Sequence, residues 1–411
     1  MKTTTTFLVF LCLCIIPILQ GFDNSASILY RHLLSDEGTY MWYQQLFNLT
    51  TFLASAIGVL IGGLAIDKWN FKKIALVDLI GLSVVSLILQ FNDSFILIIL
   101  QRFVLCFTFG YLMIGFKVLI TEVANPLHRG KILFGFLNIS IVGVLIYRYW
   151  YGSFEINIAE LDFTYAHLQI PYFILPLLIL LVIKYLPGSR INESRNALTF
   201  SYFFKPIRKK LLLVMIVLAI LLSFANSQLF FLMLLQKSID VQGNYIDTIS
   251  LAIWLVAAIT GVLSIDYFGR KGLLQFGMIA LMICAAIIIV VSLVANSPMV
   301  VWVSICLYYF LSIYTITTTA TIIILEYLPN AIRGRGMILF ALICWVPNTI
   351  NNAAIYPSIF DSEYLVYIVS ITSLVVLITS YFLFENRLVE TKKMSLDKIE
   401  TAIIDQWDSE K

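Results

Sequence analysis

Long runs of apolar residues, almost free of charge, recur along the sequence and limit the possible folds more than any other feature. Each run has 17 residues or more, and about 20 apolar residues in a helix cross the hydrocarbon core of a bilayer. In hydrocarbon, every backbone N–H and C=O needs an internal partner, so we expect helices; the alternation typical of a barrel is absent. The sequence predicts an all-α membrane protein with twelve transmembrane helices, at 7–33, 42–66, 74–91, 95–121, 131–151, 169–187, 211–236, 246–266, 273–296, 299–325, 337–358 and 364–385.

Composition supports this class and excludes others. Of the 411 residues, 60% are apolar and 12% charged, whereas soluble domains are about half apolar and about a quarter charged. A net charge of +3 from 27 basic and 24 acidic residues is too balanced to indicate a nucleic-acid partner. The six cysteines lie in apolar runs without CxxC spacing or histidine partners, which indicates small core residues rather than disulfides or metal ligands.

The basic residues predict the orientation of the chain. Of the 27 lysines and arginines, 22 lie in the even-numbered loops and the two tails, so both termini are expected on the cytoplasmic side. An alternative interpretation treats 7–19 as a secretory signal peptide, but its removal would leave an odd number of spans. Asn92 is the one glycosylation sequon expected outside, and it lies too close to the membrane for more than a weak expectation of modification.

Two charged motifs occur twice, about 200 residues apart. Glu122 precedes Arg129-Gly130 by the same spacing as Glu326 precedes Arg333-Gly334, and each motif follows the fourth span of its half. Each charged cluster alone could be a solvated membrane anchor. Two like-oriented six-helix halves indicate a secondary transporter with its substrate site near the midplane between them. We expect an N-terminal half at 1–187, a short linker at 188–210, a C-terminal half at 211–385 and a cytoplasmic tail at 386–411.

The second repeated motif carries a family resemblance. Asp67-Lys68-x-Asn-x-Lys-Lys follows the second span, and Asp266-x-Phe-Gly-Arg270-Lys follows the corresponding span of the other half. These loops resemble the signature loops of the major facilitator superfamily, and the Glu-x6-Arg-Gly pair resembles its sugar porter branch. Further similar segments are Gly21-Phe22-Asp23, Gln101-Arg102, 186–190 and 389–393. The resemblance implies cytoplasmic gating latches at Asp67, Lys68, Glu122, Arg129, Asp266, Arg270, Glu326 and Arg333.

Asp23 and Arg102 are the charged residues of most interest within the spans. A charge at mid-helix costs about 2.5–3.5 kcal/mol on insertion scales, which favours contact between the two. The resemblance implies that they face each other and that the aspartate carries the coupling proton. A carboxylate beside an arginine stays ionised at neutral pH, whereas the same group in a drier place binds a proton. Alternatively, Asp23 only anchors an outer helix end near water. Lys117 has no family counterpart and is expected to extend towards the cytoplasm.

The solute site is predicted from polar residues within the spans. Sugars need amide and hydroxyl side chains and an aromatic face, and the resemblance implies that helices five, seven, ten and eleven supply them. Each polar residue alone is as well explained by an interhelical hydrogen bond. The proline-rich motif that the family has in helix ten is replaced here by 317–321. The candidate substrate-binding residues are Asn138, Ser223, Asn226, Gln228, Thr321, Trp345 and Asn348.

Together these features predict a proton-coupled carrier of a sugar or polyol. Clusters typical of enzymes and phosphate-binding loops are missing from the sequence, and we expect no cofactor and no metal. Within the cavity we expect no charge beyond Asp23 and Arg102, apart from Lys117. The expected partners are a small solute, the proton and the lipid bilayer, with the protein a monomer in the plasma membrane. Facilitative, organic-ion or other metabolite carriage, or a non-transporting nutrient sensor, stay open as alternatives.

Overall fold

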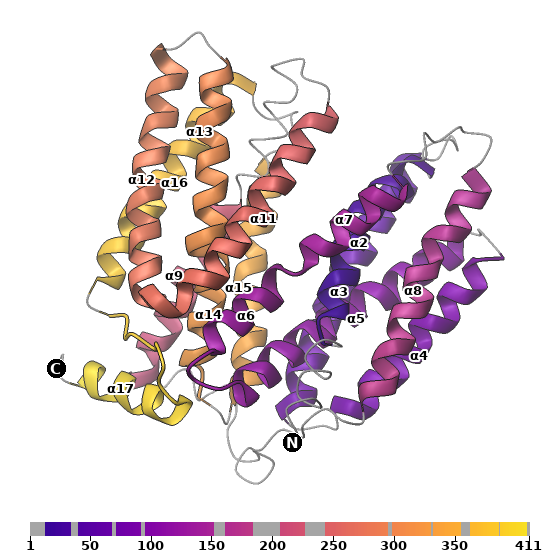
Figure 1. Ribbon diagram of the computed structural model, residues 1–411, viewed down its shortest axis with the longest axis horizontal. Helices are drawn as coiled ribbons and strands as arrows, with labels where there is room; N and C mark the ends of the chain where they lie inside the picture. The colour runs from indigo at the N-terminus through magenta and orange to yellow at the C-terminus, as the bar shows by residue number, and fades with distance from the viewer. Residues whose placement is uncertain are drawn as a thin grey trace. The chain divides into compact units, whose positions relative to one another are not determined.

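The computed structural model describes most of the chain, and its elements are helices (Figure 1). The all-α architecture predicted from the apolar runs is therefore confirmed for this part of the molecule. The described residues are 13–33, 40–67, 71–91, 95–151, 161–183, 206–226, 243–294, 298–329, 332–354, 362–385 and 387–408.

The chain forms two compact units, and each holds a short segment from the other half of the sequence. Unit 1 comprises Met1–Val123, Phe136–Ala197 and Ala331–Ile338. Unit 2 comprises Ala124–Gly135, Leu198–Asn330 and Leu339–Lys411. The exchanged segments contain Arg129 and Arg333, so the two arginines of the repeated motif are each packed with the other half's helices.

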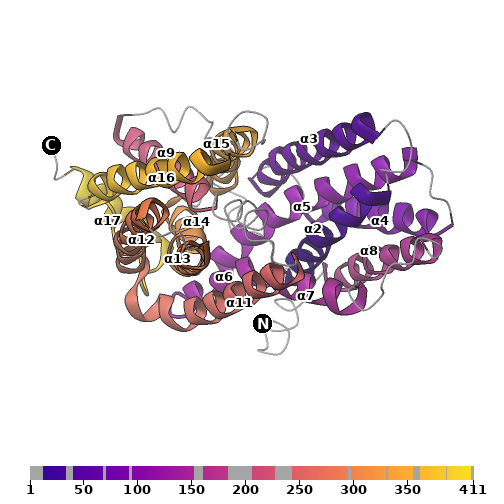
Figure 2. The ribbon, with the colours of Figure 1, turned by 90° about the horizontal axis from the view of Figure 1, so that it is seen from above.

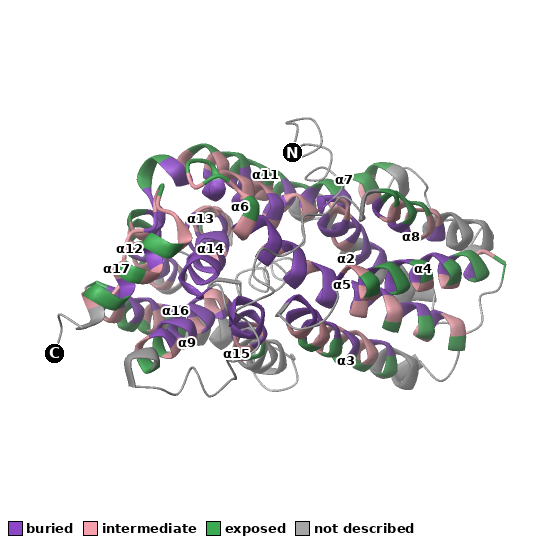
Figure 3. Cartoon of the chain, turned by 90° about the horizontal axis from the view of Figure 1, so that it is seen from below, coloured by how far each residue is buried: buried purple, intermediate pink, exposed green. Residues whose placement is uncertain are grey.

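Unit 1 is built around α5 (Phe95–Val123), which contacts α2, α3 and α4 (Figure 2). Its sequence is apolar on all sides, the pattern of a helix that is buried rather than amphipathic. Most of its residues are buried, whereas α3 and α4 carry a larger share of exposed residues (Figure 3). The other helices of the unit are α2 (Ile15–Leu33), α3 (Tyr40–Asp67), α4 (Phe71–Leu89), α7 (Ser140–Tyr151) and α8 (Leu161–Ile183).

Glycines bring α3 and α5 into direct backbone contact. A Cβ atom on Gly58 would lie 2.3 Å from the carbonyl oxygen of Phe107, and one on Gly110 would lie 2.4 Å from that of Ser55. Small residues of this kind let helices approach closely in membranes, where apolar burial alone drives no association. This close contact places the polar residues of α3 beside those of α5.

Unit 2 contains the helices of the second half of the chain. Its tenth predicted span begins as α13, passes through a π-helical turn, η4 (Ser312–Thr317), and continues as α14. A π-helical turn within an α-helix often marks a functional segment. The helices are α9 (Pro206–Asn226), α11 (Gly243–Phe268), α12 (Arg270–Val294), α13 (Pro298–Leu311), α14 (Thr318–Tyr327), α16 (Ser362–Phe384) and α17 (Leu396–Asp408), together with α6 (Arg129–Asn138) and α15 (Arg333–Ala354), which are both shared with unit 1.

The predicted spans correspond to observed helices, with three differences. The fifth predicted span is divided at Ile139 into α6 and α7. The sixth begins earlier, at Leu161. The segment 386–411, predicted only as a cytoplasmic tail, contains the 13-residue helix α17, which packs on α9 and α14. Within the described part of the chain, six helices are long and apolar enough to cross a membrane by length and composition.

Candidate functional site

Asp23 of α2 and Arg102 of α5 form a buried ion pair in unit 1. The Arg102 Nη1 atom donates to both carboxylate oxygens, at 2.7 Å from Oδ1 and 2.6 Å from Oδ2. The side chains are 2% and 9% exposed, so water screens the pair little. Such distances are those of a charge-assisted hydrogen bond. The structure thus brings together the two residues that sequence analysis singled out.

Two further helices complete this cluster. From α3, Thr51 accepts a hydrogen bond from Arg102 Nε at 2.8 Å, and the Phe47 ring centroid lies 4.6 Å from the guanidinium carbon. From α8, the Tyr172 hydroxyl donates to Asp23 Oδ1 at 3.0 Å. The carboxylate and the guanidinium therefore each have a neutral polar partner besides one another. We call Asp23, Arg102, Thr51, Phe47 and Tyr172 the α5 ion-pair cluster.

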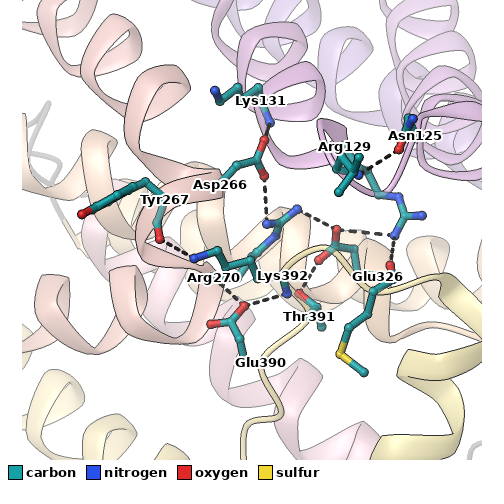
Figure 4. Close-up of polar contacts among 12 residues, drawn as sticks. Asn125, Arg129, Lys131, Asp266, Tyr267, Arg270, Glu326, Glu390, Thr391 and Lys392 are labelled. Atoms are coloured by element: carbon teal, nitrogen blue, oxygen red, sulfur yellow. Dashed lines mark hydrogen bonds and ion pairs between the residues drawn. The ribbon is translucent and has the colours of Figure 1, made fainter.

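In unit 2, a second charged cluster surrounds Glu326 at the end of α14 (Figure 4). Arg270 donates to Asp266 at 2.9 Å and to Glu326 at 3.2 Å, so it links two acidic residues. Arg129 lies 3.8 Å from Glu326 and donates to the Met394 carbonyl oxygen at 3.3 Å. The side chains of Glu326 and Arg270 are almost completely buried. Each buried charge is thus compensated by an opposite one, which burial requires.

The segment after α16 completes this second cluster. Glu390 accepts hydrogen bonds from the backbone N–H groups of Arg270 and Lys271, each at 3.0 Å, at the start of α12. A helix N-terminus has free N–H groups and favours an anion. The turn before it needs Gly269, whose φ is +86° and whose Cβ position lies 2.4 Å from a Glu390 oxygen. Thr391 donates to Glu326. The 389–393 motif is therefore part of the cluster.

The repeated Glu and Arg residues pair reciprocally rather than within each motif. In unit 1, Arg333 Nη1 donates to Glu122 Oε1 at 3.3 Å. In unit 2, Arg129 contacts Glu326 instead of Glu122. Each glutamate lies in the last turn of one helix and each arginine begins the next helix, and the two arginines pack with the other half's helices. The Asp67 side chain and all of Lys68 lie outside the described residues, so this gating pair cannot be placed.

The candidate substrate residues are distributed over both units. Asn138 is buried at the end of α6, in unit 1. Ser223 donates to the carbonyl oxygens of Ala219 and Cys344, and Thr321 donates to that of Thr317. Both hydroxyls thus make main-chain hydrogen bonds, and of these only that from Ser223 to Cys344 joins two helices. The side chains of Asn226, Trp345 and Asn348, and the whole of Gln228, lie outside the described residues.

Sequence analysis missed three polar residues that the fold buries in unit 1. Thr51 and Tyr172 support the ion pair, and nothing in the sequence indicates which helix faces would meet it. The third is Asp78 of α4, which is 9% exposed. Sequence analysis did not single it out as a candidate. The signal was present, because an acidic residue within an apolar run is a functional candidate by default.

Comparisons with known proteins identify the fold. The family model for the Major Facilitator Superfamily matches residues 5–349. A search of curated proteins found no match. Similar solved structures include the proton:xylose symporter XylE bound to 6-bromo-6-deoxy-D-glucose (TM-score 0.78, 15% identity, covering 98% of this chain and 100% of that chain). Others are FucP in the outward conformation (0.67, 14%, 91% and 98%) and the human organic anion transporter MFSD10 (0.63, 14%, 92% and 98%).

Proposed function

The chain belongs to the major facilitator superfamily, as an integral multi-pass membrane protein, and from this premise we propose a specific activity. It is a secondary active transporter that moves a sugar or polyol by alternating access, coupled to protons through Asp23 and Arg102. We propose the plasma membrane as its location, with both termini cytoplasmic, since most basic residues lie in the loops of one side.

The buried ion pair is the observation that carries this proposal. A carboxylate that touches a guanidinium at 2.6 Å is stabilised in its ionised form. If α2 and α5 move apart, the carboxylate loses that partner. A buried carboxyl without a cation has a lower free energy when it is protonated than when it is ionised. Proton binding is then linked to the conformation of unit 1, which is the requirement for coupling.

The two other charged sets are proposed to act as gating latches on the cytoplasmic side. Glu122 with Arg333, and Glu326 with Arg129 and Arg270, each tie an exchanged segment into its unit. Opening that side requires the exchanged segments to leave, which breaks these pairs. Because the buried partners are then rehydrated, the cost is smaller than that of leaving one charge alone in the interior.

The solute class rests on weaker support than the coupling. The similar solved structures include those of the proton:xylose symporter XylE and of a D-xylose-proton symporter, which are sugar carriers. The candidate residues Asn138 and Thr321 carry an amide and a hydroxyl, as recognition of a sugar requires. The organic anion transporter among the similar structures favours a second candidate, an organic-ion carrier of the same superfamily.

Uptake by the purified protein in proteoliposomes tests the proposal. Labelled hexoses, pentoses, polyols and one organic anion are supplied with and without an imposed pH gradient. We expect accumulation of a sugar or polyol that depends on the gradient. Uptake of the anion alone would indicate the organic-ion carrier. Sugar uptake that does not depend on the pH gradient would indicate a facilitative carrier. If no solute is accumulated or exchanged, the transport proposal is wrong and the nutrient sensor becomes the better interpretation.

Asp23→Asn tests the coupling, with Asp405→Asn as a matched control on the exposed face of α17. We expect Asp23→Asn to abolish gradient-driven accumulation and to retain solute exchange, since an amide cannot gain or lose the proton. The control variant should behave as the wild type. Accumulation that persists in Asp23→Asn would remove Asp23 from the coupling step.

A further inference from the structure

Asp78 is a second buried carboxyl in unit 1, in surroundings unlike those of Asp23. It lies on the buried stripe of α4, with Ala75, Leu79 and Leu82 as buried neighbours along the helix. Its Oδ2 atom has no hydrogen-bond partner among the described residues, and no ion pair to it is found there. An ionised carboxylate in such a place carries a desolvation penalty of several kcal/mol without compensation.

The single polar contact of Asp78 indicates where a proton lies. The Thr108 hydroxyl oxygen is 2.8 Å from the Val104 carbonyl oxygen and 3.1 Å from Asp78 Oδ1. A hydroxyl has one hydrogen, and a carbonyl oxygen can only accept. If the Thr108 hydrogen points to Val104, the second contact needs a hydrogen on the carboxyl. With a proton on Oδ1, Asp78 donates to Thr108 while Thr108 donates to Val104, so each contact has a hydrogen of its own; an ionised carboxylate would have to share the Thr108 hydrogen with Val104.

The helices around α4 supply no cation to this carboxyl. α4 packs on α3, α5 and α8, whose described side chains near it include one titratable group, Tyr111 of α5, which is close enough to interact electrostatically. The Tyr111 hydroxyl donates to the Phe71 carbonyl oxygen at 2.6 Å. Arg102 is paired with Asp23. It precedes Thr108 by six residues on α5, which is about 9 Å along the helix axis at 1.5 Å per residue. The two carboxyls are therefore separate sites.

The same helix contact carries more polar groups nearer to Arg102. Gln101 donates to Ser86 of α4 at 3.2 Å and also to Gln169 of α8. In contrast to this satisfied set, Asp78 makes one contact and leaves one oxygen without a partner. As a structural hydrogen bond it contributes little, because Thr108 already has an acceptor in its own helix. Hydrogen bonding alone therefore does not explain a carboxyl at this position.

We propose that Asp78 is a second proton-binding site of this protein, occupied in the present conformation and emptied when α4 and α5 separate at Asp78 and Thr108. The proposal rests on the transport function proposed above for its role in the cycle. On separation the carboxyl O–H bond breaks, the proton passes to water, and the carboxylate keeps the electron pair. Lys72 and Lys73, in the first turn of α4, favour the resulting negative charge. The reverse step reloads the site.

Infrared difference spectroscopy of the full chain in lipid bilayers tests this without relying on transport. A protonated carboxylic acid has a C=O stretching band distinct from that of a carboxylate, and the band shifts in deuterated water. We expect this band at neutral pH, its complete loss in Asp78→Asn and its retention in Asp23→Asn. It should disappear reversibly as the pH is raised. Thr108→Val leaves the carboxyl in place and should shift the band, because it removes the hydrogen-bond partner of the acid. If Asp78→Asn does not fold, Thr108→Val assigns the band instead.

Two results would overturn the proposal. One is that the acid C=O band of the wild type is unchanged in both Asp78→Asn and Thr108→Val, which would mean that Asp78 is ionised. The other is a band that stays constant at every pH at which the protein is folded, which would make the acid a fixed structural group. Wild-type protein that shows the titrating band but transports no solute would support the proton site and reject the transport function. Gradient-driven uptake without the band would do the reverse.

Discussion

Asp23 and Asp78 are both aspartates buried in unit 1 against α5, yet their neighbours differ in every respect. Asp23 touches a guanidinium at 2.6 Å and a tyrosine hydroxyl at 3.0 Å. Asp78 touches one threonine hydroxyl at 3.1 Å. The first arrangement stabilises a charge, and the second suits a neutral acid. The comparison shows that burial alone does not determine the protonation state of a carboxyl in a span; the partner does. If it is correct, variants at the two sites should affect stability very differently.

Arg102→Met is expected to have the largest effect. It leaves Asp23 buried without its cation, and breaking a buried pair in this way costs about 3–5 kcal/mol. Equilibrium unfolding by SDS in mixed micelles measures the loss. Adding Asp23→Asn to Arg102→Met should recover much of it, because the uncompensated charge is gone. If the double variant is no more stable than Arg102→Met, the cost lies in the lost arginine packing instead.

Gly110→Ala is expected to follow, because it pushes α3 away from α5. The new Cβ would lie 2.4 Å from the Ser55 carbonyl oxygen, and overpacking of this kind costs about 1–3 kcal/mol. Gly81→Ala is the matched control, since a Cβ there has nothing within 4 Å. The displacement should weaken the Thr51 contact to Arg102 and leave Asp78 and Thr108 in place. An infrared band of Asp78 that changes with Gly110→Ala would show that the two sites are not independent.

Tyr172→Phe should have a smaller effect, restricted to the first carboxyl. It removes the hydrogen bond to Asp23 at 3.0 Å while keeping the ring that packs edge-on against Phe22. Hydrogen bonds between membrane helices average about 0.6 kcal/mol and reach about 1.7 kcal/mol. The same unfolding assay gives the value. No change in stability, together with unchanged uptake, would exclude Tyr172 from the ion-pair cluster's function.

Asp78→Asn should have the smallest effect on stability, below about 0.6 kcal/mol, the average for one such hydrogen bond. A neutral amide replaces a neutral acid of similar shape, and its N–H group can still donate to Thr108. Side-by-side unfolding with Asp23→Asn checks this, since that variant leaves the Arg102 charge buried without its partner. Equal losses for the two variants would mean that Asp78 is charged, and the contrast between the sites would disappear.

The charged cluster of unit 2 illustrates how much of the candidate site could be foreseen. The family resemblance of the repeated motifs implied a gating role for Glu326, Arg270, Asp266 and Arg129, and the fold places these residues in contact. The spacing did not show that Arg129 would contact Glu326 while Arg333 contacts Glu122. That choice depends on the long-range packing that places Arg129 in unit 2 and Arg333 in unit 1. Local sequence does not describe such long-range packing.

The sequence by itself determined the helices and their approximate limits, because a bilayer admits only apolar segments of sufficient length whose backbone groups are satisfied internally. It also indicated Asp23 and Arg102, since charges are rare and costly there. Tertiary structure alone decided that Tyr172 and Thr51 would surround that pair, and that Asp78 would have no cation beside it among the described residues. The contacts around the ion pair join residues 51 to 149 positions apart in the sequence. The surroundings of Asp78 depend equally on which side chains the neighbouring helices bring to it. They follow from how five helices are rotated against one another, which the composition of each apolar run does not specify.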